Sequence, residues 1–356
     1  MDDLWLTGGR LITPRGVIEA ALRVRGGRIA AIRPRAPRAG RIRHVRGAYI
    51  APGFIDLHVW GEPALVAREA VRQGTTAFLT AVGPMAPTAW YHALARVPDE
   101  GALAGAQCLG AHAEGPFLNP ARGGALPKRW MRAPSSRELR LLMRDRHVRV
   151  MTLAPELRGA LAAIRWLAAR GVVVSLGHSE ADARTARAAI EAGASAVTHL
   201  FNGMPRWDHH RLSLLDVALT DARLTAMVIA DGIHVSGEAL HVALCAKGSE
   251  RLALVTDSIR LEPGAARLRA GAYYVKHETL AGSALTMIGA VRNAVRLGGA
   301  SLEAAVRMAT EVPARLLGIE RTRGVLAPGR RADLVVFTER LQLLATMVEG
   351  QVVHES

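Results

Sequence analysis

The sequence has few cysteines and no long apolar run. Cys108 and Cys245 are the only cysteines among 356 residues, too few for a disulfide framework, which indicates a reducing compartment. The first ten residues, MDDLWLTGGR, are acidic and lack the apolar core of a signal peptide. No segment reaches the roughly 18 consecutive apolar residues that a membrane-spanning helix needs. We therefore expect a soluble, cytoplasmic protein with no membrane partner.

Lysine and aromatic residues are also scarce. Lysine supplies only three of the 46 basic residues, at positions 128, 247 and 276, and aromatic residues make up 4% of the chain. A net charge of +15 is typical of some nucleic-acid-binding proteins, but here the arginines are dispersed and few rings are available to stack on bases. The arginine excess indicates codon bias, so no nucleic-acid partner is expected. A basic field that attracts an anionic metabolite fits the composition better.

The two ends of the chain share one pattern. In residues 1–50, the stretch ALRVRGGRIAAIRP alternates apolar and polar residues around Gly26 and Gly27, which predicts a β-hairpin. The stretch GVLAPGRRADLVVFT near the C-terminus returns to short strands and turns. We expect residues 1–50 and 325–356 to form one small β-sandwich domain built from both chain termini.

The middle of the chain, residues 51–324, has a different pattern. Short apolar runs such as TAFLTAV, GVVVSLGH and LTAMVIADG recur, and helical segments over residues 157–170 and 180–192 separate some of them. Half of all residues are hydrophobic, which is enough for a large core. Apolar strands that alternate with helices indicate a parallel sheet, and this number of units favours a closed barrel. The predicted fold class is α/β, with a (β/α)8 TIM-type barrel as the catalytic domain.

Polar residues stand at the ends of these apolar runs. The strand C-termini of such a barrel meet on one face, where active sites are built. Any one such residue is more often structural than functional, but six at six strand ends form a constellation. The six are His58, Glu114, His178, His199, His234 and Asp257.

Three of the six could hold a metal ion. Glu114, His178 and His199 provide one carboxylate and two imidazoles, a common ligand set for catalytic zinc that leaves a position open for water. Iron or manganese would suit the same set, so the sequence favours zinc without fixing the metal. The alternative is that the histidines are hydrogen-bonded core residues, which leaves three metal-competent side chains at three strand ends unexplained.

Seven segments carry a resemblance to a known family. In order along the chain, they are PGFIDLHV, HAEGPFLNP, SLGHSEAD, VTHLFNGMP, IADGIHV, LVTDSI and LAGSALTMIGAVRN. Together they resemble the amidohydrolase superfamily and, more narrowly, its N-acetylglucosamine-6-phosphate deacetylase family. The likeness runs over nearly the whole chain, and segments such as THLFNGMP are far more specific than single histidines.

The resemblance implies a metal-dependent hydrolase that removes the N-acetyl group of an amino sugar, N-acetylglucosamine 6-phosphate in the family. It implies one metal ion on Glu114, His178 and His199, with Asp257 as the catalytic acid and base. Many amidohydrolases hold a second metal with a His-x-His pair at the first barrel strand, but here Trp60 follows His58 in place of the second histidine. His58 is then either a weak extra ligand or, as we favour, a hydrogen-bonding neighbour. The family usually forms homodimers, so a homodimer is expected.

The resemblance also implies a set of substrate contacts. His234 matches a family histidine that contacts the bound substrate. We therefore predict that His234 is a catalytic residue as well as a substrate contact. Backbone donors in the turn after His199 suit an anion such as a sugar phosphate. The residues at substrate-contact positions are Ala125, Asn202, Gly203, His210, Arg211, His234, Leu280, Ala281 and Gly282.

Two departures from the family pattern affect the substrate. Leu126 stands where the family has a histidine that polarises the carbonyl, and an aliphatic side chain cannot donate a hydrogen bond. His210 aligns with a phosphate-binding arginine, often supplied across a dimer interface, and Arg211 lies next to it. Arg211 is able to bind phosphate in a bidentate manner after a shift of one residue.

Two other functions remain open. Trp60, Leu126 and Trp207 make the pocket more apolar than is usual in the family, which fits an N-acyl hydrolase for a different, non-phosphorylated specialised metabolite. A catalytically inactive relative that serves as a scaffold is the other interpretation, but such relatives lose the catalytic aspartate or the metal ligands first, and this chain keeps them.

Overall fold

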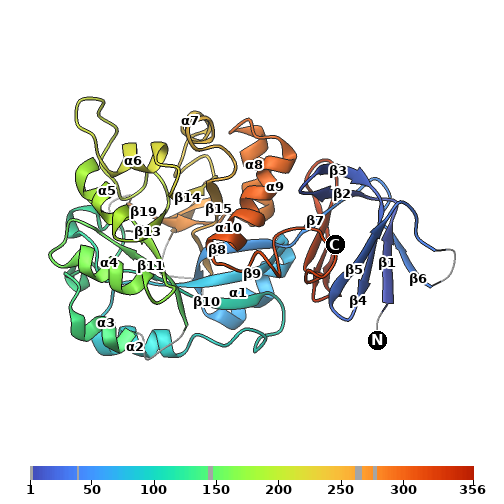
Figure 1. Ribbon diagram of the computed structural model, residues 1–356, viewed down its shortest axis with the longest axis horizontal. Helices are drawn as coiled ribbons and strands as arrows, with labels where there is room; N and C mark the ends of the chain where they lie inside the picture. Colours follow the sequence, from blue (N-terminus) through green and yellow to red (C-terminus); the bar gives the residue numbers. More distant parts are fainter. Residues whose placement is uncertain (1–2, 38–39, 143–146, 261–266, 276–278) are drawn as a thin grey trace.

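The computed structural model describes the whole chain except residues 1–2, 38–39, 143–146, 261–266 and 276–278. Strands from both chain ends lie together on one side of the molecule, and a larger body of strands and helices occupies the other (Figure 1). The hairpin predicted around Gly26 and Gly27 is present, because the strands on either side of these glycines pair antiparallel.

The terminal strands form two sheets. One has four strands in the order β5-β4-β1-β6. Their bounds are β1 (Asp3–Thr7), β4 (Ala21–Arg25), β5 (Arg28–Arg33) and β6 (Arg41–His44). The other has six strands in the order β22-β21-β20-β7-β2-β3. Their bounds are β2 (Arg10–Thr13), β3 (Gly16–Glu19), β7 (Tyr49–Pro52), β20 (Leu334–Phe337), β21 (Leu343–Val348) and β22 (Gln351–Glu355). One hydrophobic cluster joins the two sheets, with Leu6 and Leu22 from the first and Ile50 and Leu334 from the second.

The larger body is built on a twelve-stranded sheet. Eight parallel strands follow one another in chain order, from β8 to β15. Their bounds are β8 (Phe54–Gly61), β9 (Thr75–Val82), β10 (Gln107–Glu114), β11 (Val148–Leu153), β12 (Val173–Leu176), β13 (Ala194–Val197), β14 (Thr225–Ile229) and β15 (Leu252–Val255). β9 and β10 are buried at every position, as expected of parallel strands covered on both faces.

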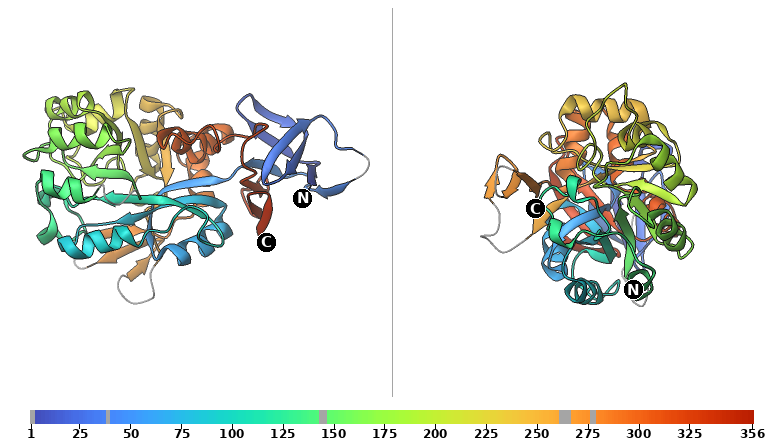
Figure 2. Two further views of the ribbon diagram at one scale, coloured as in Figure 1. Left: turned by 60° about the horizontal axis from the view of Figure 1, so that its bottom comes forward. Right: turned by 90° about the vertical axis from the view of Figure 1, so that its left-hand side faces the viewer.

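The two ends of this row of strands meet. The short strand β16 (Ser258–Arg260) follows β15 directly and pairs in parallel with β8. The backbone N–H of Asp257 donates to the carbonyl of His58 at 3.0 Å. The sheet is therefore strongly curled, as in the TIM-like barrels of α/β proteins. β17 (Arg267–Arg269), β18 (Ala272–Val275) and β19 (Thr279–Ser283) continue the sheet beyond β16 and project from the body (Figure 2).

Helices cover the outside of the curled sheet (Figure 1). Their bounds are α1 (Pro63–Ala70), α2 (Pro87–Ala95), α3 (Ser136–Leu142), α4 (Ala160–Ala168), α5 (Ala183–Glu191), α6 (Leu214–Thr220), α7 (Gly237–Lys247), α8 (Met287–Arg296), α9 (Leu302–Ala309) and α10 (Glu311–Leu316), with short 3₁₀ turns at Val71–Gln73, Pro120–Arg122 and Lys128–Trp130. The helices predicted over 157–170 and 180–192 are α4 and α5, each shorter than expected. Asp182 caps α5, and Ser213 caps α6 through a capping box with Asp216.

The fold prediction holds at the level of an α/β chain with a strongly curled sheet of successive parallel strands. The division into domains at residues 50 and 325 stays a prediction. Among the described residues, no helix is long and apolar enough to span a membrane.

Candidate active site

Four polar residues occupy the same place at four neighbouring strands. His178, His199, Asp231 and Asp257 each stand two residues past the end of β12, β13, β14 and β15 respectively. His178, His199 and Asp257 have positive φ angles of 47°, 31° and 48°. Non-glycine residues rarely adopt this conformation, which costs about 1–3 kcal/mol and concentrates at functional sites. At each of these positions the backbone turns sharply and directs the side chain over the end of the curled sheet.

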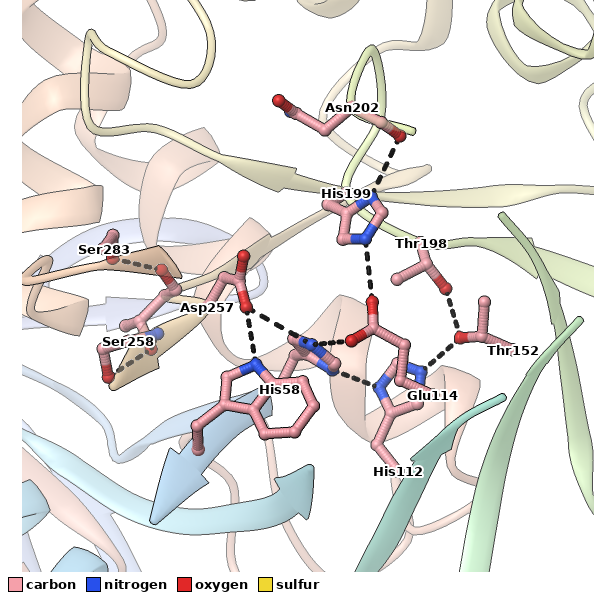
Figure 3. A network of polar contacts seen from close by, with 12 residues as sticks. His58, His112, Glu114, Thr152, Thr198, His199, Asn202, Asp257, Ser258 and Ser283 are labelled. Atoms are coloured by element: carbon pink, nitrogen blue, oxygen red, sulfur yellow. Dashed lines mark hydrogen bonds and ion pairs between the residues drawn. The ribbon is translucent and has the colours of Figure 1, made fainter. Parts of the chain in front are cut away.

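Three of the predicted metal ligands converge on one point. Glu114 is the last residue of β10, and its Oε1 lies 3.0 Å from Nε2 of His178 and 2.8 Å from Nε2 of His199. The two Nε2 atoms are 3.1 Å apart. All three residues are buried, and Figure 3 shows Glu114 and His199 facing each other across the end of the sheet.

The hydrogen bonds of the two Nδ1 atoms show how the His178 and His199 rings present their Nε2 atoms to Glu114. Nδ1 of His178 lies 2.7 Å from the carbonyl oxygen of Arg122, and Nδ1 of His199 lies 3.1 Å from that of Asn202. A carbonyl only accepts hydrogen bonds, so both Nδ1 atoms carry protons, and each ring in its neutral form presents an Nε2 lone pair to Glu114. When both rings are neutral, two lone pairs and a carboxylate oxygen meet with no proton between them. This donor set fits a divalent cation, and hydrogen bonds from Nδ1 to carbonyls commonly orient histidines that bind metals.

The charges around Glu114 agree with that fit. Burial alone would raise the pKa of the Glu114 carboxyl, but the imidazoles of His58, His178 and His199 hold that pKa well below its usual range. Burial would likewise lower the pKa of His178, yet the Glu114 carboxylate raises it. The carboxylate is therefore ionised in the buried site and stabilises positive charge beside it.

Trp60, which stands where many amidohydrolases have a second metal-binding histidine, holds Asp257 in place. The indole N–H of Trp60 donates to Oδ1 of Asp257 at 3.0 Å. Trp60 thus cannot bind a metal, but it orients the predicted catalytic carboxylate. The turn that carries Asp257 is fastened to β8 by Asp56, which is buried and accepts hydrogen bonds from the backbone N–H and the hydroxyl of Thr256 at 3.2 and 2.5 Å.

His58 lies between the two carboxylates. Its Nε2 is 3.6 Å from Oε2 of Glu114 and 3.4 Å from Oδ1 of Asp257 (Figure 3). Its Nδ1 is 2.9 Å from Nδ1 of His112, whose Nε2 contacts the Thr152 hydroxyl at 2.7 Å. Burial lowers the pKa of His58, but the carboxylates of Glu114 and Asp257 outweigh burial and raise it to about 10. His58 therefore lies close to both carboxylates, and whether it is a hydrogen-bonding neighbour or a weak metal ligand stays a prediction.

His234 is oriented by an acidic partner. Its Nδ1 lies 2.6 Å from Oδ2 of Asp231, and its backbone N–H donates to Oδ1 of the same residue at 2.8 Å. Burial raises the pKa of Asp231, but the hydrogen bond and charge of the His234 ring, together with the backbone N–H groups of Ile233 and His234, outweigh burial and lower that pKa. With Nδ1 bound to Asp231, the opposite nitrogen, Nε2, remains for a substrate.

A cavity of about 130 Å³ lies over these groups. The predicted metal ligands and Asp257 line it, together with most of the residues at predicted substrate-contact positions. Those substrate-contact residues are Ala125, Asn202, Gly203, His234, Leu280 and Ala281. Trp60 and Leu126, the two apolar departures from the family pattern, line it as well.

Three predicted substrate contacts lie outside this lining. Gly282 packs behind Asp257, since a Cβ at this glycine would lie 2.8 Å from the Asp257 carbonyl oxygen. His210 and Arg211 are exposed on the loop between β13 and α6, where the carboxylate and carbonyl of Asp208 accept from their backbone N–H groups. Their role in phosphate binding stays a prediction.

Sequence reasoning missed Asp56, Asp231 and the contact that Trp60 makes. Asp231 offered a signal, because it precedes His234 by three residues in ADGIHV, a spacing at which a turn returns the carboxylate to the imidazole. Asp56 offered a weaker one, as a lone acid inside the apolar run FIDLHV. The Trp60–Asp257 contact spans 197 positions and follows only from strand register.

Comparisons with known proteins identify the family. A model of the amidohydrolase family matches residues 49–353. The chain is 35% identical to the N-acetylglucosamine-6-phosphate deacetylase of Homo sapiens, over 100% of this chain and 92% of that protein. It is 35% identical to the N-acetylgalactosamine-6-phosphate deacetylase of Escherichia coli O157:H7, over 97% and 98%.

A solved structure is similar over the full length. A mutant of the Mycobacterium smegmatis N-acetyl-D-glucosamine-6-phosphate deacetylase, in complex with N-acetyl-D-glucosamine 6-phosphate, superposes with a TM-score of 0.89 at 35% identity. The alignment covers 99% of this chain and 100% of that one. The chain therefore belongs to the amidohydrolase family and, within it, to the group of the N-acetylglucosamine-6-phosphate deacetylases.

Proposed function

We propose that this chain hydrolyses the N-acetyl amide of an amino sugar 6-phosphate, converting N-acetylglucosamine 6-phosphate and water to glucosamine 6-phosphate and acetate. The observation that carries the proposal is the meeting of Glu114, His178 and His199 within hydrogen-bonding distance, beside an oriented Asp257. The names of the full-length relatives support the substrate class.

Amide hydrolysis needs a stronger nucleophile than neutral water and a proton for the departing amine. A divalent ion held by Glu114, His178 and His199 would supply an electrophile and lower the pKa of water to about 7. Asp257 accepts the proton of the attacking water and delivers it to the amide nitrogen as the C–N bond breaks. The Trp60 indole keeps the Asp257 carboxylate aimed at the reacting atoms, because it fixes one of the two carboxylate oxygens.

The sugar is proposed to bind toward β13 and β14. His234, held by Asp231, presents Nε2 to a sugar hydroxyl. Asn202 and Gly203 lie in the turn after β13 and offer polar backbone groups to the sugar phosphate. His210 and Arg211 are exposed on the same loop, which suits a phosphate contact made across a homodimer.

Several finer expectations belong to the same proposal. We infer zinc as the metal, a closed barrel with a β-sandwich formed from both chain ends, a homodimer, and a cytoplasmic location. The support is the ligand set, the curled sheet, the shared core of the terminal sheets and the two free cysteines at positions 108 and 245.

A second candidate keeps the chemistry and changes the substrate. The observation in its favour is that neither His210 nor Arg211 lines the cavity, while apolar Leu126 does. An N-acyl hydrolase for a non-phosphorylated metabolite would need no phosphate contact. The two candidates differ in the substrate moiety that supplies binding energy.

One experiment tests both candidates. The zinc-loaded protein is assayed for acetate release from N-acetylglucosamine 6-phosphate, N-acetylgalactosamine 6-phosphate and N-acetylglucosamine, with zinc alone as the control. We expect the phosphorylated sugars to be hydrolysed with higher kcat/KM than the free sugar. Equal kcat/KM with and without phosphate supports the second candidate, and acetate release no faster than with zinc alone overturns the first.

A further inference from the structure

A second cavity of about 460 Å³ adjoins the proposed active site. It lies between the ends of β8 and β9, helix α2 and the projecting strands β18 and β19. Its lining includes Val82, Met85, Ala93, Val97 and Val275. Arg96, the one charged side chain among the described lining residues, is exposed and follows the last residue of α2. The volume is within the range of small-molecule pockets, about 300–1,000 Å³.

The apolar cavity and the proposed active site share four lining residues, all on one side of the site. Trp60, Ala125, Leu126 and Ala281 line both the apolar cavity and the smaller cavity over the metal ligands. The residues proposed to bind the sugar, Asn202, Gly203 and His234, line only the smaller one. An amide held over Glu114 and Asp257 with its sugar toward His234 therefore directs its acyl group toward the apolar cavity.

The two large side chains shared by the cavities, Trp60 and Leu126, are themselves apolar. A Cβ added at Gly83 would lie 2.8 Å from the Trp60 ring and 3.5 Å from a Leu126 methyl. The two side chains therefore approach each other in the space that glycine, which has no side chain, leaves free at position 83. We expect the methyl group of a bound acetyl to end near this junction between the two cavities. A longer aliphatic chain that passes it would bury its methylene groups among Val82, Met85 and Val97.

We propose that the apolar cavity binds a linear aliphatic acyl chain longer than acetyl, so that the preferred substrate is an N-acyl amino sugar 6-phosphate with a medium-length acyl group. This inference rests on the proposed function and specifies its acyl specificity. The bonds formed and broken are the same as for the acetyl substrate. Water adds to the acyl carbon, the C–N bond breaks and the amine takes a proton. A medium-chain carboxylate leaves in place of acetate.

The test compares N-hexanoyl- with N-acetylglucosamine 6-phosphate on the zinc-loaded protein. Each buried methylene contributes about 0.8 kcal/mol, roughly fourfold, so the hexanoyl substrate is expected to have a kcat/KM higher by on the order of 10². Binding of the same two compounds to the Asp257→Asn variant, measured by calorimetry, gives a readout that does not depend on turnover. We expect tighter binding of the hexanoyl compound.

Variants that fill the cavity locate the effect. Ala93→Phe from α2 and Met85→Trp from the loop after β9 both place a ring in the apolar cavity, and each is expected to lower the hexanoyl-to-acetyl ratio at least 10-fold. Ala95→Phe, on the exposed face of the same helix, is the matched control and leaves the ratio unchanged. Thermal unfolding of each variant checks that it is folded, and two independent variants keep the test valid if one is not.

The outcomes separate the two proposals. Hydrolysis of the acetyl substrate with no gain in kcat/KM or binding for the hexanoyl compound overturns the acyl cavity alone. A gain that both filling variants retain overturns it as well, because the acyl chain then binds elsewhere. If neither compound is hydrolysed or bound, the proposed function fails and the acyl specificity fails with it.

Discussion

The two sides of the active site differ in how firmly the fold holds them. On the ligand side, Glu114, His178 and His199 are buried, and backbone carbonyls fix the two rings. On the substrate side, the loop between β13 and α6 exposes Trp207 to 62%, together with His210 and Arg211. From this difference we expect groups at the end of the curled sheet to determine the reaction, and recognition of the sugar phosphate to lie in surface segments that can change without disturbing them.

The largest expected effect is loss of a ligand on the buried side. His199→Ala removes one of the two Nε2 donors, so the metal content measured by mass spectrometry after dialysis should fall from one ion per chain to near zero. We expect kcat/KM for the acetyl substrate to fall by about 10⁴ or more, because both the electrophile and the activated water are lost. A variant that keeps its metal and its activity would contradict the ligand set.

Asp257→Asn should have the next largest effect and leave the metal in place. The amide keeps the shape of the side chain and still accepts from the Trp60 indole, but it cannot take a proton from water. General acid–base catalysis contributes about 10²–10⁴, so kcat should fall on the order of 10³. Metal content equal to that of the unaltered protein distinguishes this variant from His199→Ala. A decrease in kcat of less than tenfold would show that Asp257 is not the general acid–base residue.

Trp60→Phe tests whether Trp60 positions the Asp257 carboxylate or only lines the substrate pocket. Phenylalanine keeps an aromatic wall but removes the N–H that donates to Asp257 at 3.0 Å. A hydrogen bond to a charged group is worth about 1.5–3 kcal/mol, and loss of part of it in the transition state should lower kcat about 10-fold with little change in KM. An increase in KM alone would instead show that Trp60 acts only as a pocket wall.

The ligand side was also the part that could be predicted from the sequence. Glu114, His178 and His199 follow apolar runs, and the ends of parallel strands meet at one face whatever the details of the helices. The helices over 160–168 and 183–191 were recognisable for the same reason, although their ends were not. Local pattern was sufficient wherever position along a strand decided the outcome.

Contacts between distant strands could not be predicted in this way. Trp60 meets Asp257, and Asp56 meets Thr256, only because β16 pairs with β8 in one particular register. A shift of one residue in that register would point every side chain of β8 to the opposite face. Residue spacing in the sequence carries no record of that choice, so Trp60 could be recognised as a lost ligand but not as a partner of the catalytic carboxylate.

The smallest expected effect belongs to the exposed loop. Arg211→Ala should raise KM for N-acetylglucosamine 6-phosphate about 10-fold, since a charged hydrogen bond to phosphate is lost, and should leave kcat nearly unchanged because no reacting atom is touched. Arg206→Ala, another exposed arginine of the same loop, is the matched control for the change in charge. For the free sugar, neither variant should alter kcat/KM. If Arg211→Ala and Arg206→Ala raise KM equally, the loop attracts the substrate only through its overall charge. Arg211 then makes no specific phosphate contact, and the exposed loop does not form a specific substrate side. A KM effect confined to Arg211, and lost in dilute solution where a homodimer dissociates, would show that the guanidinium reaches the phosphate of the partner's site.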